Sequence, residues 1–139
     1  MSLDLSNDLD LPRKKILRGK THFQSIFKKS RRIPGGVLDL RYQIREPEPH
    51  EMGTYRFGFI VKKKLGNAVK RNLCKRRMRE AFRHHQHLIF DQFSQPGISI
   101  HGVLITKSIS AGYETMADDC QQLLTAMNTR LLKHRTKNA

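Results

Sequence analysis

The chain has 139 residues, which is enough for one domain with a single hydrophobic core. Its 27 Lys and Arg residues against 12 Asp and Glu give a formal net charge of +15, which favours a polyanionic partner. Nucleic acid is the first candidate because lysine and arginine displace condensed counterions from phosphates; an anionic membrane surface is the competitor. No apolar run could span a bilayer and no signal pattern opens the chain, so we expect a cytoplasmic protein without a membrane partner.

The chain divides into three parts by composition. Residues 1–12 are polar and rich in aspartate, which is typical of a disordered lead-in. The folded domain is predicted to span residues 13–132, without internal repeats. Residues 133–139 are predicted to be a disordered basic tail.

A short helix is predicted first, with Thr21 as its cap and its end near Lys29. Phe23, Ile26 and Phe27 recur at the spacing i, i+3, i+4, which predicts that all three side chains enter the core. The alternative is that one or both phenylalanine rings stay open for base stacking.

Strand patterns follow. Residues 31–33 are expected to form a short strand, which Pro34 interrupts. The next strand, 37–44, places apolar side chains on one face and Arg41 on the other. Residues 46–51 form an acidic, proline-stiffened loop that we expect to face away from any RNA.

The strand predicted over 55–62 has two different faces. The first, an aromatic row expected to pack under a long helix, consists of Tyr55, Phe57, Phe59 and Val61. The second suits the floor of a cleft where a backbone must come close, and consists of Arg56, Gly58, Ile60 and Lys62.

The long helix begins after a turn at Gly66, with Asn67 as its N-cap. At about 100° per residue its apolar face collects Cys74, Met78, Ala81, Phe82, His85 and Ile89. The opposite face collects Asn72, Lys75, Arg76, Arg79 and Arg83. Solvated helix faces usually mix both charges, but Glu80 is the only acid between residues 62 and 83, so this face indicates a polyanionic partner.

The last elements are a strand over 98–106, apolar on both faces and therefore internal, and a closing helix over 113–132. Cys74 and Cys120 lie on the apolar faces of helices, so we expect buried, reduced thiols. His84 and His87 share a helix face, but solvated histidines are a better interpretation than a metal site.

The chemistry of a protein nuclease is missing. Glu80, the Asp118–Asp119 pair and the acidic loop provide no convincing pair of carboxylates, and no nucleotide-binding glycine loop is present. We therefore predict a binding protein with no catalytic residues, no metal site and no cofactor of its own.

One stretch resembles a known signature. Residues 63–72, Lys-Lys-Leu-Gly-Asn-Ala-Val-Lys-Arg-Asn, followed by Lys75-Arg76 and Arg79, are similar to the motif of the bacterial ribonuclease P protein component. The resemblance extends over 14–130 and is dense only in 55–83. Two positions depart from the family pattern, since Leu73 and Lys107 stand where the family usually has arginine.

This resemblance implies an α+β fold, a single-domain α/β sandwich of order α-β-β-β-α-β-α. Its mixed sheet would contain a left-handed β-α-β crossover. It also implies a protein subunit of ribonuclease P, the ribonucleoprotein that removes the 5′ leader of precursor tRNA. In that enzyme the RNA subunit hydrolyses the substrate with Mg²⁺, and the protein lowers the Mg²⁺ demand.

The partners implied are the catalytic RNA subunit and precursor tRNA, with no obligate protein partner. The residues implied to contact these RNAs are Lys63, Lys64, Asn67, Lys70, Arg71, Asn72, Lys75, Arg76 and Arg79. The cleft implied to bind the single-stranded leader is lined by Phe23, Phe27, Arg41, Arg56, Ile60 and Lys62. A structural RNA-binding protein with no role in cleavage is the rival interpretation, because composition fits it equally well.

Overall fold

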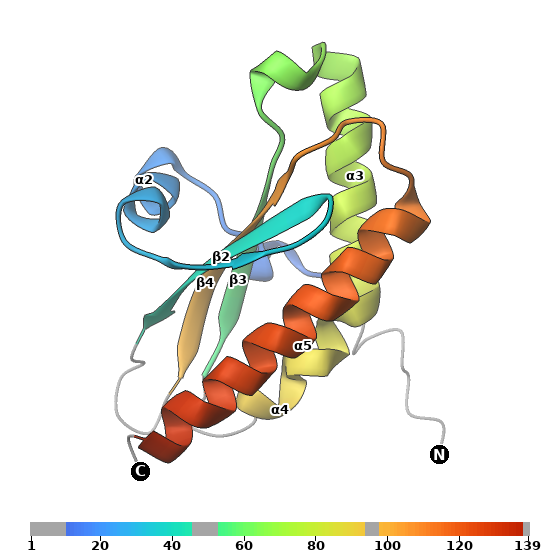
Figure 1. Ribbon diagram of the computed structural model, residues 1–139. Coiled ribbons are helices and arrows are strands. Elements are labelled where there is room, and N and C mark those ends of the chain that lie inside the picture. The colour runs from blue at the N-terminus through green and yellow to red at the C-terminus, as the bar shows by residue number, and fades with distance from the viewer. Residues whose placement is uncertain (1–10, 46–52, 94–97, 138–139) are drawn as a thin grey trace.

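The computed structural model describes residues 11–45, 53–93 and 98–137 (Figure 1). The larger helices are labelled α2, α3 and α5, and the strands are labelled β1, β2, β3 and β4. In chain order the elements are η1 (Arg13–Lys15), α2 (Lys20–Lys28), β1 (Arg31–Pro34), β2 (Leu38–Arg45), β3 (Tyr55–Ile60), η2 (Lys63–Leu65), α3 (Ala68–His85), η3 (Gln86–Ile89), α4 (Phe90–Phe93), β4 (Ser99–Thr106) and α5 (Tyr113–Lys137). This confirms the predicted α+β class.

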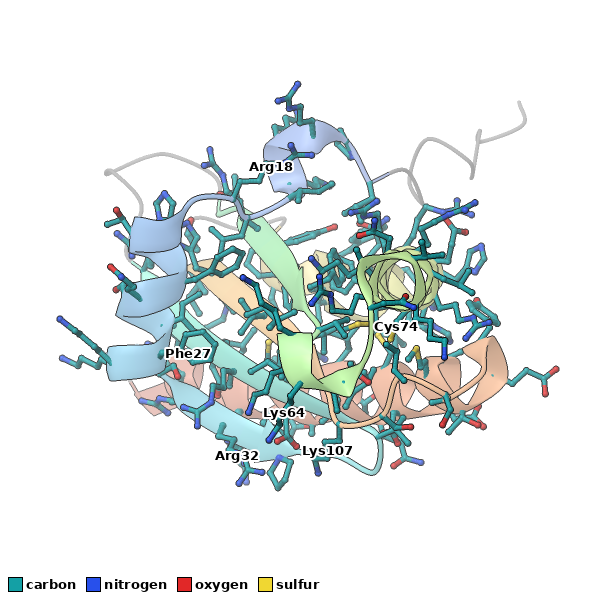
Figure 2. All side chains as sticks on the ribbon, turned by 90° about the horizontal axis from the view of Figure 1, so that it is seen from above. Arg18, Phe27, Arg32, Lys64, Cys74 and Lys107 are labelled. Carbon is teal, nitrogen blue, oxygen red and sulfur yellow. The ribbon has the colours of Figure 1, made fainter. Side chains whose placement is uncertain are left out.

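The four strands form one mixed sheet in the order β1-β2-β4-β3. β2 is antiparallel to both β1 and β4, whereas β3 is parallel to β4. β4 is therefore the internal strand that its two apolar faces predicted. The connection from β3 through α3 to β4 is left-handed (Figures 1 and 2), although about 98% of such crossovers are right-handed.

The main core lies between the sheet and the pair of helices α3 and α5. Phe82 of α3 stacks on Phe57 of β3 with 4.4 Å between the ring centroids, and Tyr55 and Phe59 meet the same ring edge-on. Cys74, Met78, Ala81 and Phe82 of α3 are buried as predicted, whereas His85 on the same face is only half-buried. The aromatic row of β3 therefore does pack under the long helix.

The opposite face of the sheet is covered by α2 and the segment before it. A smaller cluster there joins Leu17 and Ile26 to Val103 and Ile105 of β4. Ile26 is fully buried, but Phe27 keeps 48% of its surface exposed. The prediction that all three apolar residues of this helix enter the core is therefore wrong for Phe27, because the small cluster has room for only one face of a short helix.

Several predicted boundaries also change. The helix α2 already contains Thr21, and the residue before it is Gly19 with a φ of 98°, a conformation that favours glycine, so the Thr21 cap is wrong. β3 ends at Ile60, two residues early, because the chain turns into η2.

The C-terminal helix is longer than predicted. α5 continues to Lys137, so residues 133–137 belong to the helix and not to a disordered tail. Arg135 anchors this extension, since its Nε donates to Gln92 Oε1 at 3.0 Å. Residues 1–10 of the lead-in predicted over 1–12 lie outside the described residues, as does the acidic loop. Leu11, which belongs to the predicted lead-in, packs against the main core instead.

Both cysteines are buried and free, as predicted. Burial raises the pKa of Cys120 to about 12 and also raises the pKa of Cys74, so neither thiol ionises readily. None of the helices in the described ranges has the length and apolar character needed to cross a bilayer.

Candidate RNA-binding surfaces

The connection from β3 to α3 begins the first candidate surface. η2 makes the turn, and Gly66 is extended with a φ of 168°, so the prediction that Gly66 supplies the turn is wrong. A Cβ at Gly66 would lie 2.7 Å from Ile109 Cδ1, which means that glycine here permits close packing against the β4–α5 loop. The Asn67 cap is confirmed, because its side-chain oxygen accepts a hydrogen bond from the Lys70 amide at 2.9 Å.

Helix α3 presents its polar side chains in two rows. The inner row, at spacing i, i+4, i+8, is half-buried and contains Arg71, Lys75 and Arg79. The outer row is exposed and contains Asn72 and Arg76. The Arg79 guanidinium lies 5.9 Å from the centroid of the Phe59 ring, so the inner row runs beside β3.

The positive charge of these rows is not neutralised within the described part of the chain. No described carboxylate pairs with Arg71, Lys75, Arg76 or Arg79. Glu80, the only acid on α3, pairs with Arg83 at 2.9 Å. The hydrogen bonds of Arg83, opposed by partial burial, lower the pKa of Glu80, which keeps that acid charged and engaged. The rows therefore remain available to an external anion.

Lysines extend this surface beyond the helix. Lys62, Lys63 and Lys64 are all exposed in the connection before α3, as are Asn67 and Lys70 at its start. In the view of Figure 2, Lys64 lies between Phe27 of α2 and helix α3. The nine residues predicted to contact RNA thus lie in the connection before α3 and along that helix, all of them exposed or half-buried, and together we call them the α3 surface.

The predicted leader cleft is organised differently from the expectation. Phe23 is half-buried, and its ring covers Gly58 so closely that a Cβ at Gly58 would lie 2.5 Å from Phe23 Cε1. The backbone of β3 is therefore approached by the chain's own helix and not left open. Ile60 is half-buried and, like Phe23, packs against the small cluster on the α2 side of the sheet.

The Phe23 ring also separates two predicted cleft residues. Arg56, Gly58 and Ile60 follow one another on a single face of β3, so a ring over Gly58 stands between the other two. Arg56 instead lies beside His101, its partner on β4. Burial, together with the nearby cations Arg45 and Arg56, lowers the pKa of His101 to about 4.

The remaining cleft residues lie around the end of α2. Phe27 is the exposed aromatic ring there. Arg41, half-buried on β2, reaches Ser30 Oγ at 3.5 Å, which holds it near the end of the helix. The Phe23 ring therefore separates Ile60 and Lys62, at the end of β3 that leads to α3, from Arg56 near its start, and Figure 2 shows Phe27 on the same side of the view as Lys64.

A polar network that sequence reasoning missed fixes the turn between β1 and β2. Asp39 accepts hydrogen bonds from Arg32 at 2.8 Å and from the Gly35 amide at 3.3 Å, and pairs with Lys107 at 3.1 Å. Burial would raise the pKa of Asp39, but the bonds from Arg32 and Lys107 outweigh it and lower the pKa. In the sequence, the only indication of this network was the position of Asp39 on the polar face of β2.

Two further contacts hold the same turn. Lys107 Nζ donates to the Gly35 carbonyl at 2.7 Å, so this lysine has a structural role in the turn. The carboxylate of Asp119 on α5 accepts from the Val37 and Leu38 amides. These contacts give Asp119 a structural role in the turn.

The histidines after α3 also have local partners. His84 Nδ1 lies 2.5 Å from the Tyr113 hydroxyl, and His85 Nδ1 lies 2.8 Å from the Ala81 carbonyl. Within the described ranges, no group of three or more His, Cys, Asp or Glu could hold a metal ion. The cations of the α3 surface can bind anions, and the exposed ring of Phe27 can stack on unpaired bases.

Comparison with known proteins places this geometry in a family. The model of the Ribonuclease P family matches residues 11–128. The ribonuclease P protein component of Ruegeria pomeroyi is 31% identical over 116 residues, covering 81% of this chain and 86% of the relative. That of Synechococcus sp. is 37% identical over 79 residues, covering 52% of this chain and 62% of the relative.

Solved structures show the same fold. The RNase P protein from Thermotoga maritima is similar with a TM-score of 0.61 and 24% identity, covering 80% of this chain and 96% of that one. The Staphylococcus aureus RNase P protein has a TM-score of 0.61 and 23% identity, covering 81% and 94%. With the family match over most of its length, the chain belongs to the ribonuclease P protein family.

Proposed function

We propose that this chain acts as the protein subunit of ribonuclease P, which removes the 5′ leader of precursor tRNA. The RNA subunit, using Mg²⁺, carries out the hydrolysis, and the protein positions both RNAs in the cytoplasm without an obligate protein partner. The observation that carries the proposal is the α3 surface, whose cations have no described carboxylate partner. The match to the Ribonuclease P family also supports the proposal.

The α3 surface contacts structured RNA in this proposal. Its inner row of Arg71, Lys75 and Arg79 is half-buried, and Arg79 lies over the Phe59 ring of β3, which restricts these side chains before RNA arrives. Its outer row is exposed, and Asn72 adds a directional donor and acceptor among the cations. Contacts of this kind neutralise phosphates and fix orientation without reading sequence.

The leader contacts the exposed ring of Phe27 and the nearby residues Ile60 and Lys62. A half-exposed phenylalanine can stack on any base, and lysines track the backbone, so the leader is bound with little sequence preference. Phe23 supports this surface from within, by seating α2 on the sheet.

The first test is cleavage of precursor tRNA by the ribonuclease P RNA of the same source, at low Mg²⁺, with and without the protein. We expect the protein to stimulate cleavage and to leave a correct mature 5′ end. If the RNA is active at high Mg²⁺ but gains nothing from the protein at low Mg²⁺, the rival function of a structural RNA-binding protein replaces this one.

A matched pair of charge reversals locates the activity. Arg76→Glu alters the outer row of the α3 surface and should abolish the stimulation. Lys133→Glu makes the same change at an exposed position of α5, outside that surface, and should leave stimulation intact. Equal losses in both variants would mean that only net charge matters and would remove the α3 surface from the proposal.

A further inference from the structure

A second basic site lies far from the α3 surface, where β2 continues past the start of β1. The last register pair between these strands joins Arg31 to Tyr42, so the following residues of β2, up to Arg45, have no partner on β1. A pocket of about 630 Å³ lies there. Figure 1 shows that the ends of β2 and α5 lie low in the view, whereas α3 begins at its top.

Four separate elements contribute to the walls of this pocket. Lys29 and Ser30 directly follow α2, Arg31 comes from β1, Arg45 from β2, and His134 from the C-terminal part of α5. That part of α5 lies beyond the predicted end of the helix, so the wall exists only because the helix continues to Lys137. The volume falls in the range of about 300–1,000 Å³ that is common for small-ligand sites.

The positively charged side chains that line the pocket favour an anionic ligand. Lys29, Arg31 and Arg45 are exposed cations, and no lining residue is acidic. None of these three cations pairs with a carboxylate among the described residues. Arg45 makes only a long contact of 3.5 Å, to the side-chain oxygen of Gln43. Several guanidinium and ammonium groups that converge without a counter-charge are a typical phosphate site.

Tyr42 adds a buried polar group to the same lining. This side chain has no exposed surface, and its hydroxyl has no hydrogen-bond partner in the described structure. Buried hydroxyls are normally hydrogen-bonded, and one that is not marks a site that requires an explanation. An oxygen of a ligand seated in the pocket would be an acceptor of suitable chemistry for this donor.

We propose that this pocket binds the phosphate of a nucleotide within an RNA strand, as a second RNA contact separate from the α3 surface. Lys29, Arg31 and Arg45 neutralise the phosphate at the rim, and Tyr42 contributes a hydrogen bond from the floor. The protein then binds RNA beside the end of α2 as well as along α3. The site extends the proposed function but does not depend on it, because any RNA partner could use it.

The test uses the full chain with the α3 surface disabled by Arg76→Glu and Arg79→Glu, and with the proposed leader contact removed by Phe27→Ala. A labelled short oligouridine is titrated by fluorescence anisotropy at several salt concentrations. We expect residual saturable binding that weakens by roughly tenfold with Arg45→Ala and by a smaller factor with Tyr42→Phe. Loss of one phosphate contact should also reduce the magnitude of the salt slope by about one.

The controls separate the pocket from net charge and from free ligands. Lys133→Ala removes an exposed cation outside the pocket lining and should leave the residual affinity unchanged. The proposal is overturned if Arg45→Ala has no more effect than Lys133→Ala. It is also overturned if uridine monophosphate or inorganic phosphate binds as tightly as the oligouridine, since the pocket would then be a small-molecule site. Neither result bears on cleavage with the RNA subunit.

Discussion

The ring of Phe23 rests on the backbone of Gly58, and a methyl group at Gly58 would lie 2.5 Å from Phe23 Cε1. This contact seats α2 against the sheet, on the face opposite α3 and α5. The same ring separates Arg56 from Ile60, two residues of the predicted cleft. Glycine at this position therefore allows α2 to pack closely against β3.

Gly58→Ala should destabilise the fold by about 1–3 kcal/mol, because overpacking forces α2 away from β3. Urea denaturation of the free protein measures the loss. In a Phe23→Ala background the ring is gone, so the same glycine substitution should have little further effect. A cost that persists in that background would mean that the β3 backbone, and not the ring, requires glycine.

Phe27→Ala should weaken binding of leader-bearing precursor tRNA by about 1–3 kcal/mol, the usual value of one base stacked on an aromatic ring. Stability should change little, because 48% of the ring is already exposed. Mature tRNA, which lacks the leader, should bind as before. Val69→Ala, at another exposed apolar position, serves as the control. Equal weakening of both RNAs would contradict the cleft assignment.

Leu73→Arg should tighten RNA binding and increase the magnitude of the salt slope by about one, since it adds a cation to the exposed side of α3. Leu73 is 45% exposed, so no core contact is sacrificed. The matched control is Leu132→Arg on α5, where the leucine is 50% exposed. If both variants gain equally, the added charge acts without regard to place, and Leu73 is not at the interface.

Asp39→Asn should destabilise the protein at neutral pH by about 1–3 kcal/mol, because it removes a charged acceptor shared by Arg32 and Lys107. The pKa of Asp39 in the folded state lies below its unfolded value. Its contribution is therefore complete above the unfolded pKa and is lost as the pH falls through the folded pKa. Denaturation curves of both proteins should accordingly converge in acid. A constant difference at all pH values would show that the carboxylate charge is not what stabilises the turn.

Local patterns in the sequence were sufficient to predict α3 and its two faces. A cap at Asn67 and the 3.6-residue period are properties of neighbouring residues, so the buried face and the cationic face followed from sequence alone. The alternation in β3 likewise predicted the aromatic row beneath Phe82. The family resemblance supplied the order of elements and the left-handed crossover, which no local pattern contains.

Other features depend on which distant segments meet. Spacing made Phe23, Ile26 and Phe27 equivalent, and only the docking of α2 on β4 buried one and left another exposed. The pairing of Asp39 with Lys107 and the basic pocket beside Tyr42 join residues far apart in the chain. Periodicity reports the orientation of a side chain within its own element, whereas its neighbours across elements are set by the packing of the whole domain.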